Sequence, residues 1–329
     1  LMSIAEAESF LGNWDESQKA LENLYLISTE AYGTQDPRML PVLDGLLDWY
    51  LSTYSDRSTS GGYQNLVISE KLGTRMQSIL NQTGDLSDPA APQMYRKLSH
   101  LHYFIANHIK KHGEPSETGF TFNASSTASS ANSTSHMHYR RGKLALQKVV
   151  EALELQEGTS ARDQASAIAE LGDWYLVFGQ RASANQTYKL AYDFLGASEQ
   201  PEQLQEALFG EAKLIKFTDL SSIATLSEKA ASGGKAVGDE ASNKASTEAS
   251  NKEPLENGPM EISMAITSNG MPRDIEIINP PEDLDKKSRR TIFKDIRAQR
   301  YRPKLFEGAP ITTAIQFPYG IKPTAETRD

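Results

Sequence analysis

Residues 171–191 read LGDWYLVFGQRASANQTYKLA. Apolar and small residues recur at helical spacing on both sides of Gly179, which predicts two short helices joined by a tight turn. Gly179 suits that turn because a helix end favours a positive φ. Small residues at Gly172, Ala184 and Ala191 would allow two antiparallel helices to approach closely, and the aromatic residues between them would fill the wedge. We therefore predict a closely packed helix pair here.

The spacing L-G-x-x-Y-x-x-x-G-x-x-x-x-A-x-x-x-Y-x-x-A in this stretch resembles the tetratricopeptide repeat. A second copy lies upstream, where residues 46–51 read LLDWYL and echo residues 173–176. A tyrosine follows the tryptophan of each copy by 14 residues, namely Tyr63 after Trp49 and Tyr188 after Trp174. The alternative is two unrelated amphipathic helices that share four residues. The resemblance implies stacked helix pairs in which each repeat contacts its neighbours, with a concave face that binds peptides or protein segments.

Weaker copies of this pattern extend the expected repeat array over residues 1–220, which predicts an α-solenoid of about four helix pairs. We expect the aromatic residues of the two clear copies to be buried between helices, namely Trp49, Tyr50, Trp174 and Tyr175. The other expected helices cover residues 4–11, 17–32, 94–111 and 140–155, with a closing helix over 202–218.

Two stretches lack the apolar residues that a packed core needs. Residues 113–137 are rich in Ser, Thr, Ala and Asn, which predicts a flexible insertion in the array. Residues 221–257 alternate charges and small residues, which predicts a disordered linker with a span of roughly 30 Å. This composition favours two domains that move independently.

Beyond the linker, residues 258–278 read GPMEISMAITSNGMPRDIEII. Apolar and polar residues alternate on both sides of Asn269-Gly270, which predicts a β-hairpin whose two central positions both favour a positive φ. A charged helix over residues 283–299 and a strand over residues 311–319 follow. The helix is expected to face the sheet through its apolar positions, which are Ile292, Phe293 and Ile296. Pro318 suits an edge strand because it lacks a ladder donor.

Further short motifs lie at ordered positions in this module. A Leu-Asp pair at 284–285 opens the helix, the sequence RYRP follows at 300–303, EGAPI at 307–311, and IQFPY at 315–319. The order of elements and the Arg-Pro…Gly-x-Pro spacing resemble the C-terminal domain of TonB-type energy transducers, here residues 258–323. The resemblance covers about 65 of 329 residues. The alternative is another small α+β domain with a hairpin and a Gly-x-Pro turn.

The TonB resemblance implies a periplasmic domain of a Gram-negative cell envelope that binds a short segment of an outer-membrane receptor by strand addition. Carried over to this chain, it points to partner-binding residues in the last strand and in the Arg-Pro corner: Tyr301, Arg302, Pro303, Ile311, Thr313, Ile315, Phe317 and Tyr319. The chain departs from the family in its short Ala/Ser/Lys/Glu spacer and in lacking a membrane helix. The alternative function is therefore a periplasmic structural scaffold whose TonB-like module only dimerises or caps the array.

Composition narrows the function classes further. The chain is 38% apolar with a net charge of −9, which suits a soluble protein and not a nucleic-acid binder. It has no cysteine, hence no thiolate site. His108 and His112 have the spacing of metal ligands but no third ligand nearby, so we expect them on the surface, with His136 and His138 solvated. We expect no enzyme activity, no cofactor and no metal.

The first residues of the chain lack the basic start and apolar middle of a signal peptide. The chain also begins inside an expected helix pair. We therefore expect a removed export signal or membrane anchor to precede it, and contact with a membrane only through that segment.

Overall fold

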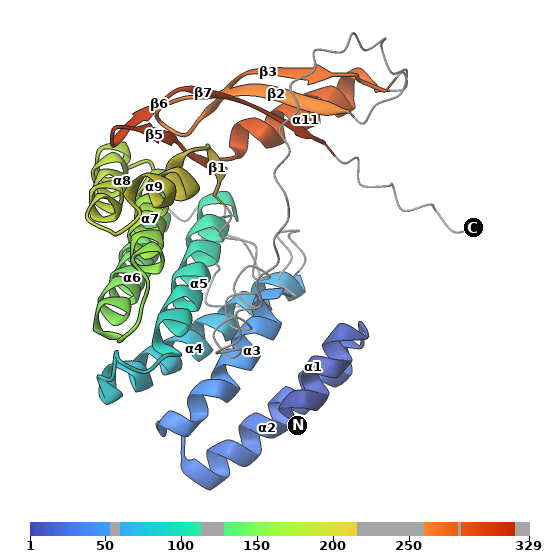
Figure 1. Cartoon of the computed structure of the whole chain (residues 1–329). Coiled ribbons are helices and arrows are strands. Elements are labelled where there is room, and N and C mark those ends of the chain that lie inside the picture. The colour runs from blue at the N-terminus through green and yellow to red at the C-terminus, as the bar shows by residue number, and fades with distance from the viewer. Residues whose placement is uncertain (53–59, 113–127, 216–259, 282–283, 320–329) are drawn as a thin grey trace. The chain divides into compact units, whose positions relative to one another are not determined.

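The computed structural model describes residues 1–52, 60–112, 128–215, 260–281 and 284–319. This part of the chain is mostly helical, with a small sheet region near the C-terminus, as the sequence predicts (Figure 1). Contacts divide the chain into two compact units. The N-terminal unit comprises Leu1–Leu171, and the C-terminal unit joins Gly172–Ile215 to the module that begins at residue 260. The expected linker over residues 221–257 lies outside the described residues.

The N-terminal unit is a succession of helices, and each of its first five α-helices packs on the next. Their bounds are α1 (Met2–Phe10), α2 (Trp14–Tyr32), the short 3-10 helix η1 (Pro37–Met39), α3 (Leu40–Ser52), α4 (Ser60–Thr83), α5 (Ala91–His112), α6 (Ala128–Leu155) and the first part of α7 (Ala161–Val177). The helices expected over residues 4–11, 17–32, 94–111 and 140–155 are confirmed. A positive φ of 79° at Gly179, after α7, confirms the turn predicted there.

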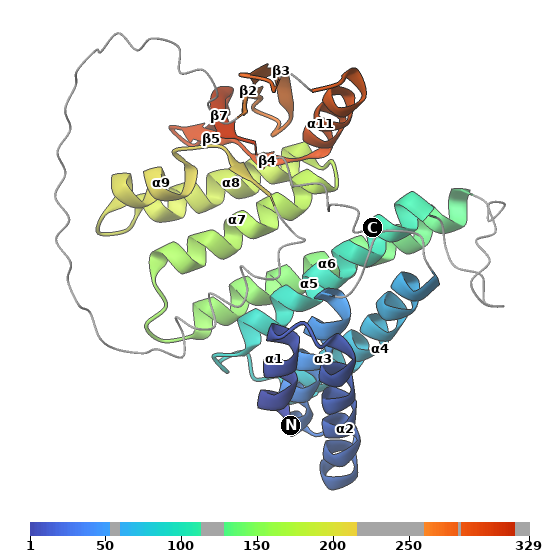
Figure 2. The same ribbon diagram turned by 90° about the vertical axis from the view of Figure 1, so that its right-hand side faces the viewer.

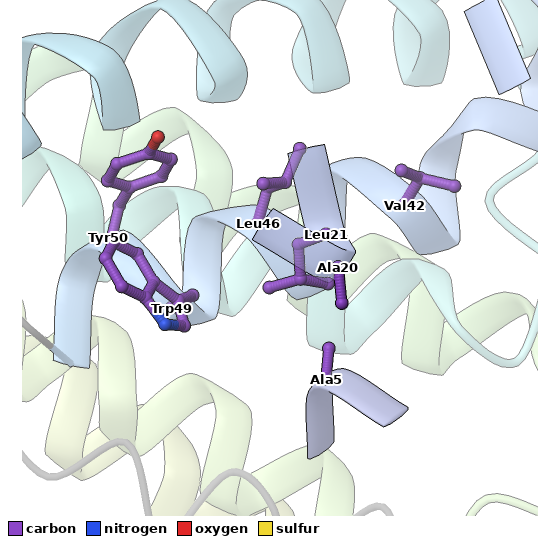
Figure 3. Close-up of a cluster of buried hydrophobic side chains, with 7 residues drawn as sticks. All are labelled: Ala5, Ala20, Leu21, Val42, Leu46, Trp49 and Tyr50. Carbon is purple, nitrogen blue, oxygen red and sulfur yellow. The ribbon is translucent and has the colours of Figure 1, made fainter. Parts of the chain in front are cut away.

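One core cluster of the N-terminal unit joins α1, α2 and α3 (Figure 3). Trp49 and Tyr50 are 8% and 5% exposed, and their rings meet edge to face at 4.9 Å. A Cβ added at Gly45 would lie 3.0 Å from the Met2 sulfur, so the small residue allows α1 to approach α3. The burial predicted for both aromatic residues is confirmed.

Residues 128–137, expected in the flexible insertion, are instead the first turns of α6. Ser and Asn are weak helix formers, but packing against a neighbouring helix outweighs such preferences. Helix α6 lies along α5, and His138 and Tyr139 are buried between them. Residues 113–127 of the expected insertion lie outside the described residues.

The C-terminal unit begins with the rest of α7 and continues through α8 (Arg181–Gly196), α9 (Pro201–Phe209) and β1 (Lys213–Leu214). The closing helix expected over residues 202–218 therefore ends early. Glycine at 210 favours a helix end, and β1 then pairs with a strand of the C-terminal module. Trp174 is fully buried as predicted, whereas Tyr175 is only half-buried.

The C-terminal module contains one helix and several strands. They are β2 (Glu261–Ile266), β3 (Pro272–Ile278), α11 (Lys286–Ala298), β4 (Tyr301–Arg302), β5 (Lys304–Phe306), β6 (Ala309–Ile311) and β7 (Thr313–Pro318). Strands β3, β2 and β7 form one antiparallel sheet in that order, and β5 pairs with β6. The predicted common sheet of the hairpin and the last strand is confirmed.

Helix α11 covers one face of this sheet. Ile292 and Ile296 are buried against Ile262, Met264 and Ile266 of β2. Phe293, expected in the same core, is only half-buried and instead lies beneath the Arg297 guanidinium at 5.9 Å. Asp285 caps the helix by accepting a hydrogen bond from the Ser288 N–H at 2.5 Å, which agrees with the Leu-Asp start seen in the sequence.

The β2–β3 turn differs from the prediction. Gly270 has a φ of 67°, but Asn269 does not have a positive φ, so the turn is not the expected two-residue type. The Gly270 N–H donates to the Thr267 carbonyl at 2.8 Å. The Gly270 carbonyl accepts from the Tyr301 N–H at 3.0 Å, and a Cβ at this glycine would lie 2.1 Å from the Tyr301 oxygen. Contact with β4 therefore fixes the turn.

Candidate protein-interaction sites

The last strand of the sheet, β7, is its first candidate site. In the described part of the module, β7 pairs with β2 and with no other strand. Ile315, Phe317 and Tyr319 are half-buried and pack on the core beneath α11, whereas Ala314 and Gln316 are exposed on the other face. The free edge therefore offers backbone groups and small or uncharged side chains, while most of the apolar side chains expected to bind a partner serve the protein's own core.

The two edges of the sheet differ in chemistry. Along β3, Arg273, Asp274 and Glu276 are exposed, Asp274 has a φ of 50°, and the register with β2 shifts. Charges and irregularities of this kind protect an edge from pairing with other strands. Strand β7 reads TAIQFP, with no charged residue and a regular register along β2. It is the less protected edge.

Ile311 and Thr313, both expected in the last strand, lie on different strands. Ile311 ends β6 and pairs with Lys304 of β5, whereas Thr313 begins β7. Ile311 therefore does not belong to the free edge. The Gly-x-Pro sequence spans the β5–β6 turn and the start of β6: Glu307 and Gly308 form the turn with φ of 51° and 76°, and Pro310 pairs with Leu305.

The Arg-Pro corner is buried. Tyr301 and Arg302 are 3% and 5% exposed, and Pro303 is buried as well. The Arg302 guanidinium donates to both carboxylate oxygens of Asp173 on α7, at 3.0 and 2.5 Å. Figures 1 and 2 both place α8 beside the β5–β6 hairpin. The corner thus contacts helices of its own unit and does not join β7 in one exposed surface.

Further polar groups complete this buried contact. The Tyr188 hydroxyl donates to Asp173 Oδ1 at 2.8 Å, and burial together with the Asp173 carboxylate raises the pKa of Tyr188 well above its usual value. Arg302 also lies over the Phe209 ring at 5.9 Å. Burial raises the pKa of Tyr301 to about 12. The signal for this contact in the sequence is Asp173 itself, a carboxylate within the otherwise apolar and small LGDWYL stretch.

A second candidate site, missed by the sequence analysis, is a groove of about 390 Å³ in the N-terminal unit. Residues of α1, α3 and α5 and the first turns of α2 line it. Its walls are mostly apolar, and Lys97, Asp48 and Glu6 add charge. The volume lies within the range of small ligand pockets.

One buried cation lies beside this groove. The Lys97 side chain is 3% exposed, and its ammonium lies 2.7 Å from Asp44 and 2.5 Å from Asp48. Burial lowers the pKa of Lys97, but the two carboxylates outweigh that effect and raise the pKa above its ordinary value. Burial raises the pKa of Asp48 to about 6. The nearby Lys97 ammonium lowers this pKa, but it only partly offsets burial, and repulsion from Asp44 raises the pKa further. Lys97 is therefore charged and fully engaged.

The histidines differ from the prediction of surface groups. His108 is 4% exposed, and His138 is 1% exposed. His138 Nδ1 lies 3.1 Å from His102 Nδ1, so one ring donates to the other, and its Nε2 lies 3.6 Å from Glu70. The described residues hold no group of three or more His, Asp or Glu placed to bind a metal ion. His136 is exposed as expected, and the side chain of His112 lies outside the described residues.

No family model, no curated protein and no solved structure matches this chain. Among the helices that the structure describes, none is long and apolar enough to cross a membrane.

Proposed function

We propose that this protein is a non-enzymatic protein-interaction protein of the periplasm. In this proposal the tetratricopeptide-like helices hold one partner, and the TonB-like module binds an extended segment of another, such as an outer-membrane receptor. The succession of helix pairs supports the first part, and the order hairpin, helix, Arg-Pro and Gly-x-Pro supports the second. The module acts as an energy transducer or as an adaptor in the cell envelope.

The edge of β7 is the observation that carries this proposal. An extended peptide beside β7 would gain backbone hydrogen bonds along its length, which supply most of the affinity in strand addition. Selectivity would come from the exposed face, where Ala314 and Gln316 alternate with half-buried side chains. The charged and irregular β3 edge would discourage binding on the opposite side.

A scaffold function is the second candidate, and a different observation favours it. Arg302 is engaged with Asp173, and β4 pairs with β1, so the module packs on α7–α9 of its own unit. In this reading the module closes the helical array, and the β7 edge pairs with a second copy of the chain. The two functions predict different stoichiometries.

Nuclear magnetic resonance on the full chain tests the proposal. Extended peptides from candidate outer-membrane receptors should shift the amides of β7 and of the paired residues on β2. Gln316→Lys should weaken this binding, because a charge at the edge opposes strand pairing. Glu276→Lys on β3 is the matched control and should leave it unchanged.

Sedimentation of the full chain separates the two candidates. A dimer that Gln316→Lys converts to a monomer, with no peptide response, would support the scaffold. Peptide shifts on β3 rather than β7, or equal effects of the two variants, would contradict strand addition at β7.

A further inference from the structure

The groove of the N-terminal unit has aromatic and acidic walls at the same place. Trp49 of α3 and Trp14 at the start of α2 both line it, and Trp14 is 45% exposed. Asp48 lies on α3 next to Trp49, and 45% of its side chain is accessible. Glu6 of α1, which is exposed, adds a second carboxylate. Indole faces and carboxylates are the groups that bind organic cations.

The charge around the groove is unbalanced. Asp44 and Asp48 share one cation, Lys97, and Asp44 Oδ1 is buried without a hydrogen-bond partner. Residues 1–52, which supply most of the groove, contain nine carboxylates and two basic residues. A positive group that enters the groove would therefore meet a surplus of negative charge in a partly desolvated site, where attraction is stronger than in water.

We propose that this groove receives the side chain of an arginine or lysine from an extended segment of a partner protein, with the cation near Asp48 and Glu6 and its aliphatic stem against the two indoles. This inference rests on one part of the proposed function, namely that the helices hold a partner protein, and it specifies the chemistry of that partner. Basic side chains suit such a site because they can bury their methylene groups while the charged end stays paired.

The surroundings favour a polypeptide over a free small cation. Phe10, the last residue of α1, and Leu11, in the turn that follows, are 92% and 69% exposed. They are the two residues that follow Ser9, which lines the groove. Apolar residues beside a cation site would contact the residues that flank the basic side chain. A free cation would leave them in water.

The three tryptophans provide the test. The indole N–H resonances of Trp14 and Trp49 report on the groove, and that of Trp174, which is fully buried in the C-terminal unit, serves as the internal control. The probes are acetyl-Ala-Arg-Ala-amide and the same tripeptide with citrulline, which is similar in shape but neutral. The full chain should show saturable shifts at Trp14 and Trp49 with the arginine tripeptide only.

Variants assign the charge. Asp48→Asn should reduce the affinity for the arginine tripeptide about tenfold, as expected for the loss of a charged hydrogen bond. Glu6→Gln, at an exposed position, should weaken it less and guards against misfolding of the first variant. Glu151→Gln, on the exposed side of α6 where it pairs with Lys148, is the matched control and should have no effect.

Several outcomes overturn the proposal: equal shifts with the citrulline tripeptide, no shift at Trp14 and Trp49, or unchanged affinity in both Asp48→Asn and Glu6→Gln. These results are independent of the proposed function of β7, because strand addition would shift the amides of residues 313–317 and leave the groove indoles unchanged. A protein that binds peptides at β7 but not arginine in the groove would refute this inference alone.

Discussion

Arg302 shows how one side chain can be misread from sequence. As part of an Arg-Pro motif beside a strand it looks like a partner-binding residue, yet both ends of its guanidinium contact Asp173, which is far away in the sequence. An arginine fork matches a carboxylate in this geometry, whereas lysine offers a single point charge. The buried pair therefore belongs to the structure of the C-terminal unit.

Breaking this pair should be costly. Arg302→Leu is expected to destabilise the C-terminal unit by about 3–5 kcal/mol, because it leaves the Asp173 carboxylate buried without its cation. Arg302→Lys should recover only part of the loss. Urea unfolding followed through Trp174 fluorescence measures the effect.

The control for this experiment removes every polar member of the contact. In the triple variant Asp173→Leu, Tyr188→Phe and Arg302→Leu, no charge remains buried, so most of the stability should return. An Arg302→Leu protein that unfolds at the same urea concentration as the parent would show that the ion pair does not form.

Gly270 provides a second prediction at the scale of the residue. Gly270→Ala should destabilise the C-terminal unit by more than the roughly 1 kcal/mol that a positive φ costs an alanine, because the new Cβ would collide with the Tyr301 carbonyl. Gly308→Ala is the matched control, since it has a similar φ but its nearest neighbour, the Tyr192 ring, lies at 3.4 Å. Thermal melts that rank the two variants equally would contradict the close contact of the turn with β4.

At the scale of the element, α5 and α6 carry the histidine pair. Burial lowers the pKa of His102 to about 3, with repulsion from His138 and Arg141 adding to the effect. Burial and Arg141 lower the pKa of His138 to about 4. The Glu70 carboxylate faces His138 but is too far, at 3.6 Å, to hold a proton on the ring by itself. Both rings are therefore neutral in the folded protein near neutral pH.

This pair should make the N-terminal unit sensitive to acid. The unfolded chain binds protons at His102 and His138 below pH 6.5, while the folded chain resists protonation until about pH 4, so stability falls as the pH drops between these values. The expected loss at pH 5 is on the order of 2 kcal/mol per histidine. Helix unfolding by circular dichroism at pH 7, 6 and 5 measures it.

The double variant His102→Leu and His138→Gln separates the histidines from the carboxylates that also titrate in acid. It should unfold with a weaker dependence on pH between 7 and 5 than the parent. Parallel curves for the two proteins would refute the role assigned to the pair.

The elements also show what local sequence can and cannot predict. Helices with strong apolar spacing, such as α3, and the alternating strands β2 and β3 were predicted correctly. In each of them the apolar residues recur with a single period, either that of a helix or that of a strand. The predictions for the first turns of α6 and for the end of α9 were wrong, because contacts with distant segments determine the structure there. Helix α6 packs on α5, and the strand that follows α9 pairs with β4. The groove could not be predicted, because it brings together residues of four helices, of which α5 is distant in sequence from α1, α2 and α3.

At the scale of the whole molecule, the division between the units does not coincide with the expected boundary at residue 220. Gly172–Ile215 belongs to the same compact unit as the C-terminal module. The repeat pattern in residues 171–191 predicted that this helix pair belongs to the array. Sequence periodicity indicates that the two helices pair, but it does not indicate which other segment packs on them. The buried contact of Asp173 with Arg302 belongs to this second unit.

A truncated chain tests this division. A protein that ends at residue 227 lacks the module, so Asp173 loses its hydrogen bonds with Arg302 and the Phe209 ring loses its contact with the same guanidinium. Amides of α8 and α9 should then exchange with solvent much faster than in the full chain, whereas those of α3 and α5 should keep their protection. Unchanged exchange in α8 and α9 would mean that the helices fold as a unit without the module.

The pairing of β1 with β4 has a consequence for the covalent chain. Leu214 lies opposite Tyr301 and Lys213 opposite Arg302, so hydrogen bonds between strands join the segment before the expected linker to the module after it. The peptide bonds between residues 228 and 257 are then not needed to keep the module in place. A gene divided within this stretch should yield two halves that reassemble into a noncovalent complex, which makes the protein a natural candidate for a split reporter.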